Sequence, residues 1–249
     1  MHEIFRASNS YRRWLWVLKI VTGLTKFLVN RGREMAKMNH LETQEIISDI
    51  YIIKTKNANF YVIKSGDGYI AIDAGSGNKN IAKDELSKLN IDPEKMIAVL
   101  LTHTDFDHLS ALSLFKNATI YISEQEVQMI DGSTSRMFDI GKNKLDYDYK
   151  VLKDGEEVYF NKTKVKPLLT PGHTNGSMSY LIDGKYLFVG DNLSLKNGHV
   201  ELFNSLFNMN DDIQRSSLNH LAKIQNVHYI FTAHYGFSDE YNNAFKHFL

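Results

Sequence analysis

Short apolar runs separated by turn signals dominate the chain from about residue 45, a pattern typical of β-strands. In the first half these runs predict strands at 46–55, 59–64, 69–73, 96–101 and 118–122. Residues 65–68, with the sequence SGDG, are expected to form a hairpin turn between the second and third strands. Apolar residues at helical spacing predict helices at 78–90, 108–116 and 123–130. Ser123 followed by Glu126 indicates a reciprocal capping arrangement at the start of the last helix.

The second half predicts a further meander, with strands at 149–153, 157–160, 164–170, 177–183 and 185–190. The tail is predicted to form a helix at 211–225, a strand at 227–232 and a helix at 238–248. Residues 133–150 are polar and poorly patterned, so we expect an excursion loop able to contact substrate. Two β-rich halves, each flanked by helices, predict an α+β fold in which two mixed β-sheets pack face to face with the helices outside.

The first 40 residues have a different pattern, and we interpret them as a basic amphipathic segment that precedes one domain over 41–249. Its basic residues Arg12, Lys19, Lys26 and Arg33 recur every seven positions and so lie along one side of a helix, whereas the opposite side is aromatic and aliphatic. The apolar stretch is short for a membrane-spanning helix. The alternatives are an interfacial helix at a membrane surface through residues 11–33, a helix packed on the domain or a second subunit, and an overlong start with Met35 or Met38 as the natural first residue.

Charge and cysteine content narrow the functional classes. The first 40 residues hold eight basic side chains and two glutamates, a net charge of +6, so the rest of the neutral chain carries −6. A basic segment joined to an acidic body favours an anionic partner for the segment alone and argues against a nucleic-acid-binding body. The absence of cysteine excludes thiolate metal sites and thiol catalysis and fits a reducing cytoplasm. We therefore expect a cytoplasmic protein, either free or membrane-associated through its N-terminal segment.

Candidate metal ligands follow the ends of four predicted strands. They are His103, Asp105, Asp107 and His108 after 96–101, His173 after 164–170, Asp191 after 185–190, and His234 after 227–232. Loops at one edge of a sheet scaffold converge in space, so these segments are expected to supply ligands to adjacent metal ions. Imidazole nitrogens and carboxylate oxygens without sulfur suit zinc, iron or manganese.

In these motifs the chain resembles the metallo-β-lactamase superfamily, from about residue 45 to its end. The resemblance rests on Asp73 in IDAGSG, the HxxxDH motif from His103 to His108, His173 in PGHT, Asp191 and His234. It implies an αββα sandwich that binds two divalent ions. By position in the motifs, His103, Asp105 and His173 would hold the first ion, Asp107, His108 and His234 the second, and Asp191 would bridge them. Asp73 would order the ligand loops.

One position departs from the family pattern. The usual HxHxDH motif has histidine where this chain has Asp105, so an anionic oxygen replaces a neutral nitrogen. Zinc is the first choice for the two ions, and the harder first site shifts the preference toward iron or manganese. The competing interpretation is that Asp105 does not bind and that the first site is weak or empty.

The resemblance implies a hydrolase. Two metal ions lower the pKa of a shared water, and the resulting hydroxide would attack the carbonyl carbon of a small-molecule ester, thioester or lactone, as in the glyoxalase II-like and lactonase-like branches. Asp107 and Asp191 are the predicted catalytic residues, Asp107 orienting the nucleophile or passing a proton to the leaving group. The alternatives are an iron-dependent oxygen- or sulfur-handling enzyme of the persulfide dioxygenase kind, a nuclease or phosphodiesterase, and a membrane-attached binding protein with a structural metal site.

Other candidate residues have weaker patterns. His199, after Asp191 in the chain, is either a residue that reaches the substrate or an exposed loop histidine, and Tyr235 is either an oxyanion donor or a packing residue. Arg136, Lys142 and Lys144 in the excursion loop are candidates for a substrate carboxylate. The remaining histidines, His40 among them, have no partner motif. We expect a small-molecule substrate and no nucleic acid; the sequence leaves the oligomeric state open.

Overall fold

The computed structural model describes residues 38, 40–135 and 143–249. The predicted N-terminal amphipathic helix lies outside the described residues, so membrane contact through residues 11–33 stays a prediction. Within the described part, no helix has the length and apolar character needed to cross a membrane.

The first sheet is mixed and has seven strands within the described residues, in the spatial order of the chain. They are β1 (Gln44–Ile47), β2 (Ile50–Lys54), β3 (Asn59–Ser65), β4 (Gly68–Ile72), β5 (Met96–Leu100), β6 (Thr119–Ser123) and β7 (Tyr149–Leu152). Strands β1 to β4 pair antiparallel, and β4 to β7 pair parallel. The predicted hairpin at 65–68 is confirmed, because Ser65 pairs with Gly68 across the turn.

The second sheet has six strands within the described residues, in the order β15-β14-β11-β10-β9-β8. They are β8 (Val158–Phe160), β9 (Thr163–Leu169), β10 (Met178–Ile182), β11 (Tyr186–Phe188), β14 (Tyr229–Phe231) and β15 (Phe237–Ser238). Among these six described strands, β11 and β14 alone pair parallel. A separate two-stranded ribbon, β12 (Leu193–Lys196) with β13 (His199–Leu202), was not predicted from the sequence.

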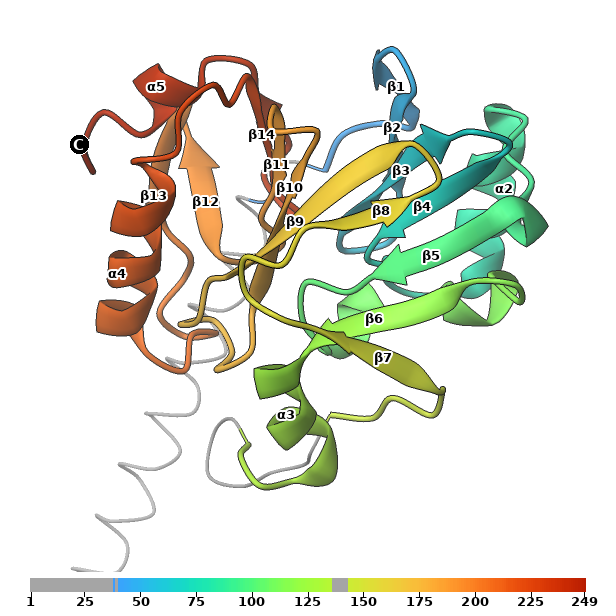
Figure 1. Ribbon diagram of the computed structural model, residues 1–249, viewed down its shortest axis with the longest axis horizontal. Helices are drawn as coiled ribbons and strands as arrows, with labels where there is room; N and C mark the ends of the chain where they lie inside the picture. Colours follow the sequence, from blue (N-terminus) through green and yellow to red (C-terminus); the bar gives the residue numbers. More distant parts are fainter. Residues whose placement is uncertain (1–37, 39, 136–142) are drawn as a thin grey trace, which may run out of the picture. The chain divides into compact units, whose positions relative to one another are not determined.

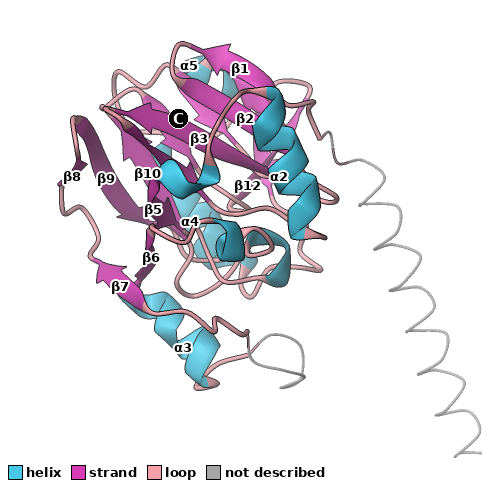
Figure 2. Cartoon of the chain, turned by 90° about the vertical axis from the view of Figure 1, so that its right-hand side faces the viewer, coloured by secondary structure: helices cyan, strands magenta, loops and turns pink. Residues whose placement is uncertain are grey.

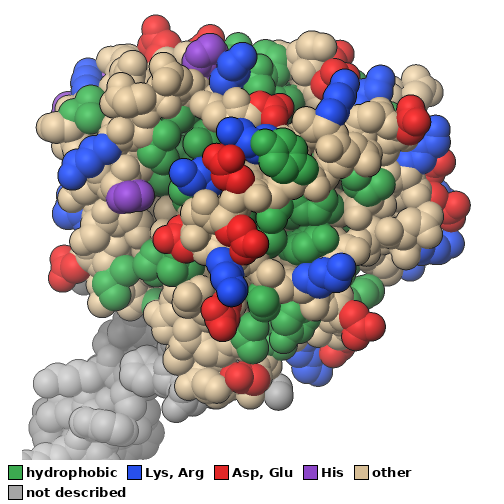
Figure 3. Space-filling view, viewed as in Figure 1, with side chains coloured by type: hydrophobic (Ala, Val, Ile, Leu, Met, Phe, Trp, Pro, Cys, Tyr) green, Lys and Arg blue, Asp and Glu red, His purple; other side chains and the backbone are tan. Residues whose placement is uncertain are grey.

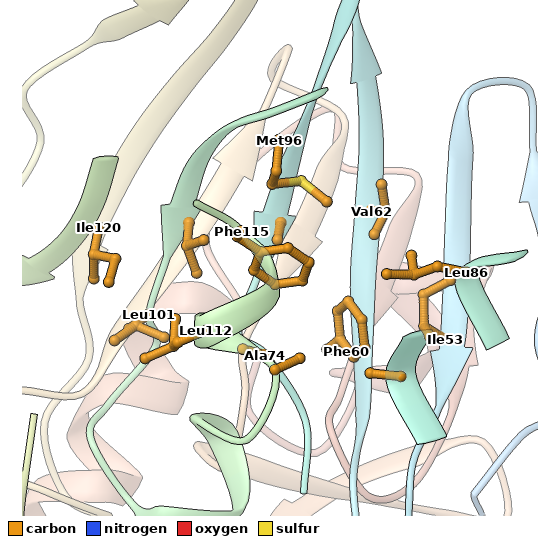
Figure 4. Close-up of a cluster of buried hydrophobic side chains, with 14 of the residues drawn as sticks. Ile53, Phe60, Val62, Ala74, Leu86, Met96, Leu101, Leu112, Phe115 and Ile120 are labelled. Atoms are coloured by element: carbon orange, nitrogen blue, oxygen red, sulfur yellow. The ribbon is translucent and has the colours of Figure 1, made fainter. Parts of the chain in front are cut away.

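Apolar side chains on alternating strand positions build three cores between four layers. The first core lies between α2 (Lys79–Lys88) and the first sheet and includes Phe60 and Leu86 (Figure 4). The second fills the space between the two sheets, where Tyr180 and Phe231 are fully buried. The third joins the second sheet to α4 (Asp211–Leu221). The predicted αββα sandwich is therefore confirmed, with α2 and α4 on opposite outer faces (Figures 1 and 2).

Several local predictions were wrong. The run 46–55 is two strands, because Asp49 adopts a φ of 70° and turns the chain between β1 and β2. Strand β7 belongs to the first sheet and not to the second meander: η4 (Glu124–Glu126) and α3 (Val127–Asp131) connect β6 to its parallel partner. In the tail, the expected 11-residue helix is reduced to α5 (Tyr241–Ala244) after β15.

The segment 108–116 does not form the predicted α-helix. The 3₁₀ turn η2 (Phe106–His108) ends at the first residue of this segment, and a second 3₁₀ turn, η3 (Leu112–Leu114), lies within it. Its backbone bonds instead to the loop after β4: Ala74 donates to the carbonyl of His108, and Ala111 donates to the carbonyl of Ala74. These bonds hold the His108 segment against the end of β4.

Gly190, directly before the candidate ligand Asp191, has a φ of +56°, and a Cβ there would lie 2.3 Å from Thr102 Oγ1. Gly184 has a similar φ of +70°, but a Cβ there would meet nothing within 4 Å. An alanine at Gly184 would therefore add backbone strain alone, whereas an alanine at Gly190 would add both backbone strain and steric overlap with Thr102.

We predict that Gly190→Ala lowers the melting temperature more than Gly184→Ala. Both substitutions add the left-handed strain of about 1–2 kcal/mol, and only Gly190→Ala adds overpacking of about 1–3 kcal/mol. The measurement is thermal unfolding of the metal-free proteins by circular dichroism. Equal shifts for the two variants would show that the contact with Thr102 carries no steric cost.

Candidate metal centre

Strand direction brings the predicted ligands to one edge of the sandwich. In the first sheet β4 and β5 are parallel, so Asp73 and the segment 102–108 leave adjacent strand ends. In the second sheet β10 is antiparallel to both β9 and β11, and β11 is parallel to β14. The chain therefore leaves β9, β11 and β14 at one edge, toward His173, Asp191 and His234 respectively.

All seven predicted ligands come together in three overlapping groups. The groups are His103 with Asp105 and His173, His103 with His108 and Asp191, and Asp107 with His108 and His234. Within each group the candidate ligand atoms lie within 4.8 Å of one another. The first and third groups are the two triads that the sequence predicts for the first and second ions.

Asp191 lies between the two triads. Its Oδ2 is 3.9 Å from His103 Nε2 and 3.5 Å from His173 Nε2, on the side of the first triad. Its Oδ1 is 3.4 Å from His108 Nε2 and 3.2 Å from His234 Nε2, on the side of the second. His234 Nε2 is also 3.2 Å from Oδ2, so the carboxylate of Asp191 lies against imidazoles of both triads, which is the position that a bridging ligand needs.

Hydrogen bonds orient the two histidines of the first loop. Asp73 Oδ2 lies 2.9 Å from His108 Nδ1, and the hydroxyl of Thr102 donates to the same carboxylate. Because that hydroxyl has one hydrogen, its oxygen accepts from His103 Nδ1 at 3.0 Å. Both rings therefore carry their proton on Nδ1 and direct Nε2 toward Asp191.

The other two histidines are held in the same way by oxygen acceptors. His173 Nδ1 lies 3.3 Å from Oδ1 of Asn208, and His234 Nδ1 lies 2.7 Å from the backbone carbonyl of Asn57. With Nδ1 donating, the neutral ring presents the Nε2 lone pair to the site. This is the tautomer that metal-binding histidines adopt when the outer nitrogen is hydrogen-bonded.

The donor set fits divalent cations. The Nε2 atoms of His103 and His108 are buried and have no hydrogen-bond partner among the described residues. A buried polar atom without a hydrogen bond destabilises the folded protein. The two unpaired Nε2 atoms therefore indicate that a bound cation accepts their lone pairs. Four imidazoles and three carboxylates without sulfur suit zinc, iron or manganese.

The charges of the site are strongly coupled. Burial opposes protonation of His108, but the carboxylates of Asp191 and Asp73 outweigh it and raise the pKa of His108 well above its usual value. The pKa of Asp191 falls well below its usual value although burial opposes this, because His234 and His108 favour its charged form. Burial likewise opposes the rise in the pKa of His234 that Asp191 causes. Cations bound at Nε2 would take the place of these protons.

One histidine at the site was missed by the sequence reasoning. His40 Nε2 lies 3.5 Å from His234 Nδ1, and the two ring centroids are 5.7 Å apart. Burial, followed by the charge of His234, lowers the pKa of His40. No motif surrounds His40 in the sequence. The sequence therefore carries no signal for it, and only tertiary packing brings it to His234.

The weaker candidates lie as follows. Tyr235 packs its ring against Phe203, whose ring also lies 4.9 Å from that of His173. The geometry thus favours a packing role for Tyr235. His199 lies against His247 and contacts the carbonyl of Asn243, outside the three ligand groups. Arg136 and Lys142 lie outside the described residues, and Lys144 is exposed.

The family model of the metallo-beta-lactamase superfamily matches residues 54–234, the part of the chain that holds the ligand motifs. The chain belongs to this superfamily. The match includes strands of both sheets and all seven candidate ligands, with His234 at its last position.

Curated relatives of the superfamily are similar at low identity. A probable metallo-hydrolase of Methanocaldococcus jannaschii is 32% identical over 64% of this chain and 66% of its own length. A hydroxyacylglutathione hydrolase of Buchnera aphidicola is 27% identical over 59% of this chain and 51% of its own length. A probable polyketide biosynthesis zinc-dependent hydrolase of Bacillus velezensis is 29% identical over 57% and 60%. The chain thus matches about half to two-thirds of the length of these relatives.

Solved structures of the superfamily share the fold. A subclass B3 metallo-beta-lactamase of Bradyrhizobium japonicum aligns with a TM-score of 0.61 and 21% identity, over 79% of each chain. A metallo-beta-lactamase family protein of Thermus thermophilus aligns with a TM-score of 0.61 and 18% identity, over 81% of this chain and 78% of that one.

We predict that Asp73→Asn weakens metal binding at the second triad. Asparagine tolerates the φ of 62° at this position but loses the charge that His108 Nδ1 faces. Loss of such an outer partner costs about 10- to 100-fold in metal affinity. Metal titration of the apoprotein measures the effect, with Asp183→Asn as the control because Asp183 shares a positive φ and lies outside the ligand groups. Unchanged affinity in Asp73→Asn would show that Asp73 does not support the ligand.

Proposed function

We propose that this protein is a hydrolase that binds two divalent cations and cleaves a small-molecule ester, thioester or lactone. The observation that carries the proposal is the position of Asp191, whose carboxylate lies within 3.5 Å of imidazoles from both triads. A purely structural metal site has no need of a second ion with an open position. Two ions bound there would lower the pKa of a shared water and supply the nucleophile.

The exposure of the site fits the proposed roles of its residues. The side chains of Asp105 and Asp107 are 14% and 20% exposed, whereas that of Asp191 is 5% exposed. Substrate would approach from the side of these two carboxylates. Asp107 is placed to orient the water or to carry a proton to the leaving group, with its Oδ2 3.7 Å from His234 Nε2. Asp191 would hold the two ions at a fixed separation.

Names of relatives support the class of reaction. The relative in Buchnera aphidicola is named a hydroxyacylglutathione hydrolase, and an acyl group on the glutathione thiol is a thioester. The relative in Bacillus velezensis is named as zinc-dependent. We therefore propose zinc as the first choice, with iron or manganese as alternatives that Asp105 favours. Phe106, 74% exposed between Asp105 and Asp107, is available to contact an apolar part of the substrate.

An iron-dependent oxygen- or sulfur-handling enzyme is the second candidate, and the oxygen ligand of Asp105 is the observation that favours it. A nuclease or phosphodiesterase role has less support. On the face shown in Figure 3, Lys and Arg side chains alternate with Asp and Glu, and no continuous basic surface is present among the described residues visible there.

We predict that the full-length protein, loaded with zinc, iron or manganese and then desalted, retains two ions per chain. Asp191→Ala should lower this to one ion or fewer, because both triads lose a shared ligand, while Asp107→Asn should retain more metal and lose turnover. The measurement is metal content by mass spectrometry. Retention of two ions in Asp191→Ala would contradict the bridging role.

The reaction class is tested on the same preparations. We expect hydrolysis of a thioester, ester or lactone, with β-lactams and a phosphodiester as comparison substrates and oxygen uptake measured in parallel. Turnover with redox-inert zinc supports the hydrolase. Oxygen consumption by an iron-loaded protein without hydrolysis would support the second candidate instead.

A further inference from the structure

Asp105 differs from an imidazole in having two ligand atoms. A carboxylate can bind a cation through one oxygen or both, whereas histidine offers one nitrogen. In the structure the two oxygens of Asp105 have different surroundings. Oδ2 lies 3.4 Å from Nε2 of both His103 and His173, inside the first triad. Oδ1 accepts a hydrogen bond from Asn143 Nδ2 at 3.1 Å.

The direction of this hydrogen bond is fixed by a chain of partners. Asn143 Nδ2 also donates to Thr104 Oγ1 at 3.0 Å. The hydroxyl of Thr104 in turn donates its one hydrogen to Glu126 Oε1 at 2.7 Å. Thr104 Oγ1 can therefore only accept from Asn143, and Asp105 as a carboxylate also only accepts. Both neighbours require the NH₂ group of Asn143, which excludes the flipped amide.

Glu126 anchors the chain of partners in the core. Its side chain is fully buried and accepts from the backbone N–H of Thr104 at 2.8 Å and from the hydroxyl of Thr174 at 2.7 Å. Thr104 follows His103 and Thr174 follows His173, so one carboxylate ties together the two loops of the first triad. The predicted capping role is half right: Ser123 Oγ accepts from Glu126 N–H, but the Glu126 side chain binds the two threonines.

The backbone of Asn143 is also held. Its N–H donates to the carbonyl of Met129 in α3 at 3.0 Å. Asn143 is thus fixed at the backbone by α3 and at the side chain by Thr104, before it reaches Asp105. A side chain held at both ends loses little further freedom when it orients a neighbour.

We propose that Asn143 is a positioning residue that occupies Asp105 Oδ1, so that Asp105 presents Oδ2 alone and takes the place of an imidazole in the first triad. The inference rests on the proposed metal site. Binding through one oxygen keeps a coordination position open for water or substrate, which binding through both oxygens would fill. The network Glu126–Thr104–Asn143 is therefore this chain's accommodation of aspartate at the second position of HxHxDH.

The test is a double-mutant cycle on the full-length protein. We expect Asn143→Ala to weaken Co²⁺ binding at the first site by about 10- to 100-fold and to leave the second site unchanged. In an Asp105→His background, the same substitution should change affinity less than about threefold, because imidazole has one ligand atom and needs no selection between oxygens. Co²⁺ titration followed by visible absorption reports both the affinity and the coordination of the ion.

Two further variants sharpen the cycle. Asn143→Asp should weaken the first site more than Asn143→Ala, because it places a second carboxylate against Asp105 Oδ1. Asn117→Ala is the matched control: its amide donates to the carbonyl of Glu94 at 2.8 Å, away from the ligand groups, and its removal should leave Co²⁺ binding unchanged. Thermal unfolding of the metal-free variants shows whether each one folds.

The outcomes separate the inference from the proposed function. Equal losses from Asn143→Ala in the Asp105 and His backgrounds, including failure to fold in both, would show a general structural role and overturn the inference. If Asp105→Ala abolishes the first site but Asn143→Ala does not affect it, the metal site stands and the positioning role is wrong. If Asp105→Ala retains two ions, the proposed ligand set itself is wrong.

Discussion

The electrostatic contact between Asp191 and four imidazoles is the constraint on which the site depends. A carboxylate that is only 5% exposed cannot keep its charge without compensation, and here His173, His108 and His234 all lie within 3.5 Å of it. The same carboxylate raises the pKa of His108 and His234. The site is thus a network of opposite charges that brings candidate ligands for divalent cations together.

Sheet topology explains how distant segments reach this one carboxylate. In each of the parallel pairs β4–β5 and β11–β14, the loops that follow the two strands leave at the same edge, and burial between the sheets holds these edges together. Outside the ligands, oxygen acceptors hold every Nδ1: Thr102, Asp73, Asn208 and the carbonyl of Asn57. The ligand atoms are therefore oriented by the fold before any ion binds, which is the condition for a preorganised centre.

In the proposed metal site, the first triad accommodates a changed candidate ligand. Aspartate in place of histidine brings a negative charge and a spare oxygen, and the spare oxygen is met by the amide of Asn143. The hydrogen-bond chain then continues through Thr104 to a carboxylate buried in the core, Glu126. Because each step joins a donor to an acceptor and the chain ends on a fully buried carboxylate, these hydrogen bonds restrain the orientation of Asp105.

Much of the fold and the ligand set could be predicted from the chain before its structure. The apolar runs predicted β3 and β4, and the sequence also predicted α2 and α4. The motifs at the strand ends predicted seven ligands, and the structure brings all seven together. These features are local, because period and turn chemistry are properties of neighbouring residues. Their order along the chain was enough to indicate the family, which the family model confirms.

Tertiary contacts decided what local pattern could not. The segment 108–116 has helical periodicity but bonds its backbone to Ala74 and Gly75, so the helix does not form. Strand β7 was placed in the wrong sheet, because its partner β6 is reached across α3 and not through a hairpin. His40, Glu126 and Asn143 reached the site through contacts with residues 22 to 194 positions away, a separation at which sequence pattern carries no information about distance. The sequence alone thus determined which residues are the candidate ligands, and the packing of the two sheets decided which other side chains orient them.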